Sequence, residues 1–442
     1  NVAIGKSALS ADTTGRLAVA IGKDALASQN FTTGAENYNV AVGALAGKDM
    51  STGIYNTFIG GIAGESNTVG QRNIAVGLQA LEKNTASDTN VAAGVNALRN
   101  HNLTSTGDAY NVAIGDSAGT AITTGIYNTL MGGLAGDSLT DADENVAIGL
   151  HALGQDTLGS DSVAIGSNAL FNQNFTTATS AFNTAVGYRA GFTSTTGIKN
   201  VYIGGDAALS ATTANKNVVI GSQAADSMTT GEENVFIGES AAGSGTVTGN
   251  DNVAVGRAAL LNLTSGTNNT CLGHDAGITG SPGGNINNDN NIIVLGDENV
   301  SSLNCQASLT TPSDQRDKTD FSDLDLGLDF VKALEPVTYY WDKRSKYGDK
   351  YADDYDLNAQ TPDGTHKEDW MDVGFKAQSV QALEEAAGYK IGDKKNLTVA
   401  LSGDGKQYSL RYEKFVPILV KAIQDQDAII QSLTARITAL ES

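Results

Sequence analysis

Short apolar groups recur along the first two thirds of the chain, each preceded by a polar residue and followed by glycine. The unit is Asn-Val-Ala-Ile/Val-Gly, and copies begin at residues 1, 18, 39, 56, 73, 90, 111, 128, 145, 162, 183, 200, 217, 234, 252, 269 and 291. Eleven of the 16 intervals between them are 17 residues, three are 21, one is 18 and one is 22. A fixed short period of this kind is typical of a solenoid.

The alternation within a unit predicts a short β-strand. Val112 and Ile114 should point to one side and Ala113 to the other. We expect the small alanine to face away from the coil interior, towards a closely packed surface such as another chain. A second apolar pair often follows, so each 17-residue unit is expected to form a coil of two short strands and two turns. The glycine permits the turn.

Stacking such coils places like residues on like residues. The recurring asparagines should then hydrogen-bond along the stack. At ~4.8 Å per stacked strand, 17 coils predict a shaft of roughly 80 Å. The fold class expected is therefore mostly β, a repeat-built β-solenoid or β-roll.

A longer period is superimposed on the short one. The 21-residue intervals recur every 72 residues, and their inserted segments, at 30–33, 102–105 and 174–177, carry Phe31, Leu103 and Phe175. One interpretation is that these three side chains contact a receptor, because added loop length on a rigid scaffold often carries binding groups. The other is that they tuck into the shaft and seal the longer turn. Their burial decides between the two.

Charge divides the chain near residue 313. Residues 1–312 hold 11 Lys+Arg and 25 Asp+Glu, whereas residues 313–442 hold 17 and 24. The net charge of −21 disfavours binding to nucleic acid or an anionic membrane. No apolar run approaches the ~20 residues of a membrane span. Cys271 and Cys305 are expected to be buried thiols rather than a disulfide framework. No cofactor or metal is expected.

The repeat units resemble the head repeats of trimeric autotransporter adhesins and similar repeats in phage tail fibres. This resemblance covers about residues 1–296 and implies a stacked β-roll or β-helix. Because the chain opens inside a repeat, we expect a preceding part of a longer protein, through which other tail proteins would attach.

The pattern changes after Gly296. A polar linker, residues 297–312, leads to Ser313-Asp314-Gln315-Arg316-Asp317-Lys318. Further on stand Leu334-Glu335-Pro336-Val337-Thr338-Tyr339-Tyr340-Trp341, then Val373-Gly374-Phe375-Lys376-Ala377-Gln378, and then Phe415-Val416-Pro417-Ile418. In position and order these motifs, over residues 313–442, resemble the endosialidase-type intramolecular chaperone domain, a small α+β domain.

That resemblance implies a domain that assists trimerisation and then cuts the chain beside a serine. Carried over, Ser313 is the nucleophile and Lys318 the general base. A lysine must be neutral to take the serine proton, so its pKa must fall through burial or neighbouring cations. Arg316 would favour this and Asp314 would oppose it.

The last residues, 416–442, predict a coiled coil. Apolar residues at Val416, Leu419, Ile423, Ile430, Leu433, Ile437 and Leu440 are spaced by 7, 4 and 3 residues, with polar Gln426 among them. The pattern of Ile and Leu favours dimers, whereas the family resemblance favours trimers.

Together these features predict a homotrimeric phage tail fibre or tailspike fragment that attaches to a glycan or protein receptor on the host surface, with the virion as its location. One alternative is a bacterial trimeric surface adhesin, extracellular and anchored to the outer membrane by its C-terminus. Residues 421–442, a charged amphipathic helix, do not suit such an anchor. The other alternative is a purely structural fibre spacer. A glycan-cleaving tailspike is disfavoured, because the acidic residues are scattered through turns rather than gathered in pairs.

Overall fold

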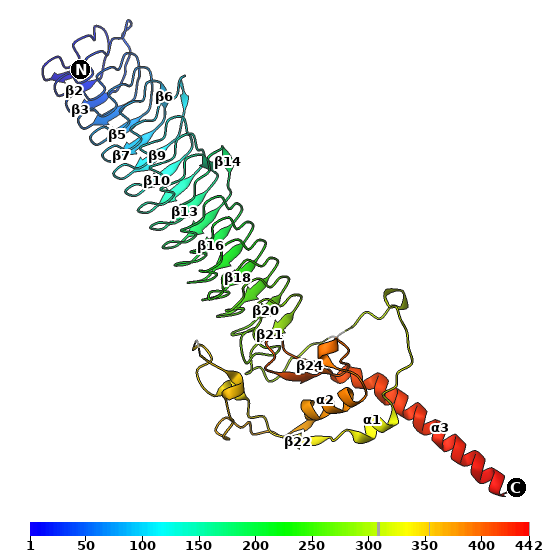
Figure 1. The fold of residues 1–442 in the computed structure, drawn as a ribbon. Helices are drawn as coiled ribbons and strands as arrows, with labels where there is room; N and C mark the ends of the chain where they lie inside the picture. Colours follow the sequence, from blue (N-terminus) through cyan, green and yellow to red (C-terminus); the bar gives the residue numbers. More distant parts are fainter. Residues whose placement is uncertain (307–309, 353, 442) are drawn as a thin grey trace. The chain divides into compact units, whose positions relative to one another are not determined.

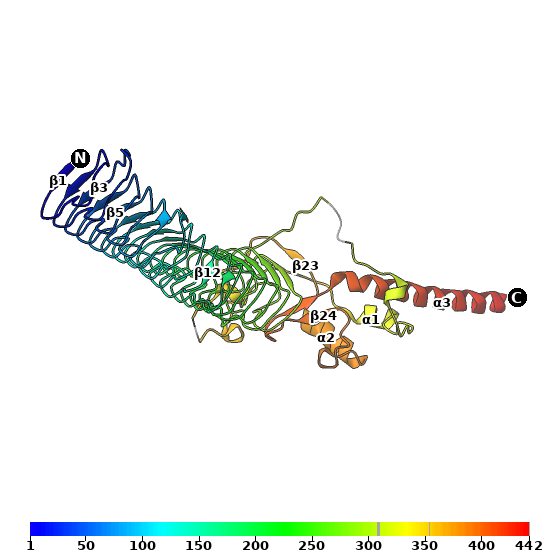
Figure 2. The same ribbon diagram turned by 90° about the horizontal axis from the view of Figure 1, so that it is seen from above.

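The first part of the chain is a β-solenoid in a computed structural model that describes residues 1–306, 310–352 and 354–441 (Figure 1). Each coil contributes one three-residue strand to a 17-stranded sheet. The strands are β1 (Val2–Ile4), β2 (Val19–Ile21), β3 (Val40–Val42), β4 (Thr57–Ile59), β5 (Ile74–Val76), β7 (Val91–Ala93), β9 (Val112–Ile114), β10 (Thr129–Met131), β11 (Val146–Ile148), β13 (Val163–Ile165), β15 (Thr184–Val186), β16 (Val201–Ile203), β17 (Val218–Ile220), β18 (Val235–Ile237), β19 (Val253–Val255), β20 (Thr270–Leu272) and β21 (Ile293–Leu295). Seen from a second direction, successive coils again lie one behind another (Figure 2).

Neighbouring strands pair in parallel and in the register that the repeat predicts. Val112 pairs with Val91 of the coil before and Thr129 of the coil after. The predicted solenoid is therefore confirmed. The last unit was placed one residue too early: Ile292 accepts from Thr270 and occupies the asparagine position, so the unit begins at 292 and its interval is 23 residues. Asn291, the residue taken as its start, instead pairs with Asn268.

The strands face the opposite way from the sequence prediction. Ala113 is completely buried inside the coil, whereas Ile114 is 39% exposed on the outer face. The same pattern, with a buried central residue between half-buried or exposed ones, holds from β2 to β21. The reason is size: the interior of so short a coil is narrow, so alanine fits it and the branched side chains turn outward.

The few bulky central residues are accommodated by glycines in the same stack. Phe58 is fully buried in the coil interior. A Cβ on Gly47 or Gly64 would lie only 2.8 or 2.7 Å from its ring. Seven other coils instead carry leucine at this turn position, for example Leu81 and Leu98. Interior volume is thus conserved along the stack, as close packing requires.

The second side of each coil is a turn rather than the expected second strand. Leu81 has a φ of 53°, yet its backbone N–H still bonds to Ala97 of the next coil at 2.9 Å. The asparagine stack is confirmed. Asn39 Oδ1 accepts from the backbone N–H of Asn56 at 2.9 Å, and the relation repeats at Asn56 and Asn73. These side chains are fully buried, so each bond satisfies a group that water cannot reach.

The inserted segments add short ladders beside the main sheet. β6 (Ser87–Asp88) pairs with β8 (Gly107–Asp108), and β12 (Gly159–Ser160) pairs with β14 (Thr179–Ser180). Phe31 and Phe175 are buried, with 7% and 5% of their surface exposed, and Leu103 is half-buried. At Phe31 and Phe175 the side chains have therefore tucked into the shaft, and neither ring is an exposed platform for a ligand.

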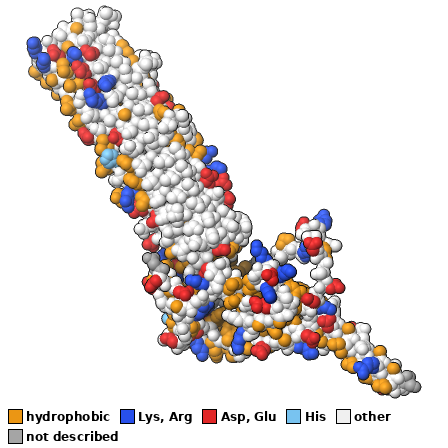
Figure 3. Space-filling view, in the orientation of Figure 1, with side chains coloured by type: hydrophobic (Ala, Val, Ile, Leu, Met, Phe, Trp, Pro, Cys, Tyr) orange, Lys and Arg blue, Asp and Glu red, His pale blue; other side chains and the backbone are white. Residues whose placement is uncertain are grey.

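A second compact unit contains residues 276–286 and 294–442, while the solenoid unit contains residues 1–275 and 287–293. The segment 276–286, expected in the shaft, thus groups with the C-terminal part, where Asn285 N–H donates to Asp404. Cys271 is buried as expected, whereas Cys305 is exposed, because it follows the repeat in the polar segment; the two form no disulfide with each other. Figure 3 shows that charged side chains are sparse on the visible shaft face and denser on the C-terminal unit.

The C-terminal unit is a small α+β domain. Its helices are α1 (Leu328–Ala333), α2 (Ala377–Ala386) and α3 (Phe415–Glu441); its strand pairs are β22 (Val337–Tyr339) with β23 (Asp372–Gly374), and β24 (Val399–Leu401) with β25 (Tyr408–Leu410). Short 3-10 turns lie at Gln315–Asp317, Arg344–Lys346, Leu357–Ala359, Ile391–Asp393 and Tyr412–Lys414. The core gathers Leu326, Phe330, Val380, Val399, Phe415 and Ile418. Among the described residues, no helix has the length and apolarity that crossing a membrane requires.

Candidate functional site

Ser313 and Lys318 lie next to each other at the start of the C-terminal unit. The Gln315–Asp317 turn folds the chain back, so that Lys318 Nζ is 2.5 Å from Ser313 Oγ. The same ammonium lies 3.4 Å from the Ser313 carbonyl oxygen. The two residues that the family resemblance named are therefore within hydrogen-bond distance in a single chain.

Asp314 and Arg316 shape the turn rather than the chemistry. Asp314 caps the turn by accepting from the Arg316 backbone N–H at 2.9 Å, and its carboxylate also pairs with the Arg316 guanidinium at 2.6 Å. The Arg316 hydrogen bonds hold the pKa of Asp314 below its ordinary value. Because the guanidinium is neutralised by this carboxylate, it is a weak source of the cationic field that was expected to favour a neutral Lys318.

All residues from 310 to 323 are exposed. A hydroxyl beside an amine at 2.5 Å is the arrangement for general-base activation of serine. That activation needs a neutral amine, however, and burial is what favours one. The site in one isolated chain therefore has the geometry of a Ser-Lys pair without the burial that its chemistry needs.

The exposed aromatic residues of the shaft are a feature that the sequence analysis did not single out. Tyr38 packs against Tyr55, and Tyr110 against Tyr127, in near-parallel pairs with ring centroids 5.9 Å apart. Each of these tyrosines directly precedes the asparagine of a repeat unit. The sequence already indicated these pairs, because the 72-residue period places Tyr110 at the position equivalent to Tyr38 and Tyr127 at the position equivalent to Tyr55.

Fold and site define a repeat-built β-solenoid that ends in a small α+β domain with a Ser-Lys pair at its start. Residues 313–389 match the family model described as chaperone of endosialidase. No curated protein and no solved structure matches the chain. A segment that matches the chaperone-of-endosialidase family thus follows a solenoid of mostly 17-residue coils, an architecture consistent with a phage tail fibre or tailspike.

Proposed function

We propose that this chain forms a homotrimeric tail fibre or tailspike of a phage, in which the domain at 313–442 assembles three solenoid shafts and then releases itself by cutting the chain before Ser313. The shaft would comprise residues 1–296 and the linker residues 297–312. The protein would act on the virion, in attachment to a host-surface glycan or protein.

The observation that carries the proposal is an apolar strip along the shaft that a single chain leaves uncovered. Outward side chains of the strands are half-buried or exposed from one end of the sheet to the other. The exposed ones lie towards its two ends and are Val2, Ile4, Ile59, Ile74, Val76, Ile114, Met131, Val255, Leu272, Ile293 and Leu295. A contiguous apolar surface of this kind marks an interaction site. A second and third copy of the same shaft fit it best, because their strips have the same length and period.

Helix α3 supports the same conclusion. Its first turns anchor the domain core through Phe415 and Ile418, while the heptad residues Val416, Ile423 and Leu440 are 60%, 66% and 87% exposed. The expected coiled coil over 416–442 would bury this face.

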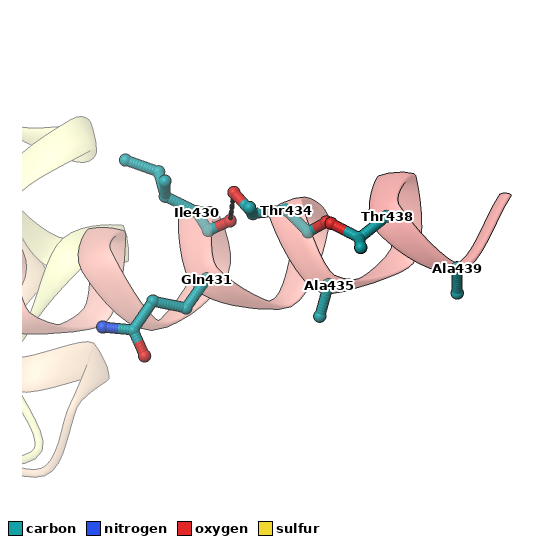
Figure 4. A pocket seen from close by; sticks show the side chains of 6 residues that line it. All are labelled: Ile430, Gln431, Thr434, Ala435, Thr438 and Ala439. Atoms are coloured by element: carbon teal, nitrogen blue, oxygen red, sulfur yellow. Dashed lines mark hydrogen bonds between the residues drawn. The ribbon is translucent and has the colours of Figure 1, made fainter. Parts of the chain in front are cut away.

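A shallow groove on the same helix is lined by Ile430, Gln431, Thr434, Ala435, Thr438 and Ala439 (Figure 4). The hydroxyls of Thr434 and Thr438 bond back to carbonyls one turn earlier, at 2.9 and 3.0 Å, so they need no outside partner. The groove therefore offers mainly methyl groups and small side chains, a surface suited to a packed neighbouring helix.

The proposed cleavage uses only groups of this chain and water. Ser313 Oγ attacks the Pro312 carbonyl carbon while neutral Lys318 Nζ accepts the Oγ proton. The Pro312–Ser313 amide bond then breaks, its nitrogen takes a proton from Lys318, and Pro312 is left as an ester on Oγ. Water hydrolyses the ester, which frees the Pro312 carboxylate and the Ser313 hydroxyl. Burial of Lys318 among three copies would favour the neutral amine that this step needs.

Intact-mass measurement of the purified protein tests the cleavage. The wild-type chain should yield fragments of residues 1–312 and 313–442, whereas Ser313→Ala and Lys318→Ala should each give one full-length species. Ser322→Ala, at an exposed serine of the same segment, is the matched control and should cut normally. A wild-type trimer that stays uncut over days contradicts the autoprocessing proposal. A monomer in light scattering contradicts the trimer.

A further inference from the structure

One column of exposed side chains on the shaft carries paired aromatic rings. It consists of the residue immediately before the asparagine of each coil. The Tyr38–Tyr55 pair has an interplanar angle of 23° and the Tyr110–Tyr127 pair one of 16°. All four rings are about half exposed, from 48% to 51%, so they are accessible in the chain and are not part of its core.

The first tyrosine of each pair is linked to a carboxylate two residues earlier in the chain, just after the inserted segment. The Tyr38 hydroxyl donates to Glu36 at 3.0 Å, and the Tyr110 hydroxyl donates to Asp108 at 3.3 Å. Four coils make one 72-residue super-unit, and the third super-unit has Phe182 and Ser180 at the corresponding positions. The ring hydroxyl and its carboxylate partner are thus present together in two copies and absent together in the third.

Polar groups fill the column between the two aromatic pairs. Arg72 Nη2 lies 2.9 Å from Asp108 and 3.4 Å from Asp88, and its Nε bonds to Thr89 at 3.4 Å. Hydrogen bonds from Thr89 and Arg72 hold the pKa of Asp108 below its ordinary value, so this carboxylate is an anionic acceptor at neutral pH.

We define the tyrosine tract as Tyr38, Tyr55, Arg72, Thr89, Tyr110 and Tyr127, six consecutive positions of one column. At ~4.8 Å per coil it is about 24 Å long. It is one residue wide, so its shape suits an extended ligand more than a globular one.

We propose that the tyrosine tract binds a linear, electrically neutral polysaccharide. Tyrosine rings offer apolar surface with a polar edge, which suits a sugar ring with its C–H groups and hydroxyls. The carboxylates and the guanidinium supply acceptors and donors for those hydroxyls. Arg72 lies beside Asp88 and Asp108, and Arg16 pairs through the backbone with Glu36. Three carboxylates thus face two arginines, and this excess of negative charge disfavours a sialylated or sulfated chain. The inference rests on the proposed attachment function and names its ligand class.

The test is a binding measurement with the assembled full-length protein on an oligosaccharide array. The array should hold neutral hexose and N-acetylhexosamine chains together with sialylated and sulfated ones. The wild-type protein should bind neutral chains. Tyr38→Ala and Tyr110→Ala should each weaken binding about tenfold, a loss between that of an ordinary contact and that of a hot-spot residue. Asp108→Asn, which keeps the shape but removes the charge, should weaken it less.

Tyr188→Ala is the matched control, because Tyr188 is 54% exposed on the same shaft but lies outside the tract. It should bind like the wild type. Absence of binding to every neutral chain, preference for anionic chains, or unchanged binding by the tyrosine variants overturns the inference. So does loss of the trimer in the tyrosine variants alone, which would make the tract an interface between copies. In the first three cases normal trimers and cleavage would leave the proposed function standing.

Discussion

The solenoid and the C-terminal unit differ in how completely each buries its apolar side chains within one chain. The solenoid closes its own interior: alanines, leucines and glycines alternate in volume, and the asparagine stack satisfies buried backbone groups from coil to coil. The C-terminal unit has a small core and leaves large side chains such as Trp370, Met371 and Val373 exposed. Its sequence is non-repetitive and richly charged. Repetition thus completes an interior within one chain, whereas the small domain leaves large apolar side chains uncovered.

The comparison also separates two kinds of apolar surface in the shaft. Inward alanines belong to the fold of one chain, and outward valines and isoleucines belong, in our proposal, to the assembly. The two kinds alternate residue by residue along each strand, so neighbouring substitutions should have different consequences.

The largest effect is expected from removing residues 313–442 before folding. Long-range strand pairing is slow and leaves strand edges exposed while it proceeds. Without a domain that holds three shafts together, the local concentration of shafts is low and they associate slowly. Residues 1–312 expressed alone should therefore appear as aggregate or monomer in sizing with light scattering. The Ser313→Ala chain is the control, since it keeps the domain attached. Soluble, heat-resistant trimers of residues 1–312 in good yield would show that the shaft needs no chaperone.

A charge on the outward strip should break the assembly without unfolding the coil. Ile114→Asp would place an unpaired carboxylate in the proposed interface, a cost of about 3–5 kcal/mol per chain. Sizing should show loss of trimer while circular dichroism keeps the β signal. Ser105→Asp, which adds the same charge at an exposed position of an inserted segment, should leave the trimer intact. If both variants stay trimeric, the strip is not the interface.

An inward substitution next to it should act on folding instead. Ala113→Leu adds bulk to a filled interior and should destabilise the chain by about 3 kcal/mol, the upper end for overpacking. Ala93→Ile changes the outward position of the preceding rung, between Val76 and Ile114, and should be neutral or stabilising. Denaturant unfolding of both variants checks this. If both variants lose the same free energy of unfolding, the inner and outer faces of the strand do not differ in the way proposed here.

The repeat could be predicted from the sequence because period and register are one-dimensional properties. Counting from asparagine to asparagine fixed the strand pairs, and only the last unit was misplaced by one residue. The direction of the side chains could not be obtained this way. Alternation shows that Ala113 and Ile114 lie on opposite faces, but the narrow coil interior that selects alanine is a property of the closed three-dimensional turn.

The candidate site divides in the same manner. Ser313 and Lys318 are five residues apart, and a single turn brings them together, so a local motif sufficed. The pairing of Arg316 with Asp314 was not foreseen, because either partner was free to face Lys318. The tyrosine tract was missed because its members are 17 to 21 residues apart and gain meaning only when coils stack.

The smallest effect concerns a buried imidazole in the middle super-unit. His101 is fully buried, and neither ring nitrogen has a hydrogen-bond partner among the described residues. In the flanking super-units the corresponding residues are Gln29 and Gln173, which accept from Asn39 and Asn183 at 3.0 and 2.8 Å.

Burial lowers the pKa of His101 to about 4, and the polar backbone at Thr123 offsets only part of that effect. The unfolded chain, with an ordinary histidine pKa near 6.5, therefore binds the proton more tightly than the folded chain. The histidine's contribution to stability is complete above about pH 6.5 and falls as the pH drops towards 4. The loss should reach about 2 kcal/mol per chain at pH 5. His101→Gln should remove this part of the pH dependence and supply the missing acceptor for Asn111. Thermal unfolding of the wild type and His101→Gln at pH 7.5 and pH 5 gives the stability that each protein loses between the two pH values. Carboxylates that titrate in this range affect both proteins equally, so their contribution cancels when the two losses are subtracted. If the wild type and His101→Gln lose equal stability between these pH values, His101 is protonated at little cost and the solenoid interior is more open to water there than its burial indicates.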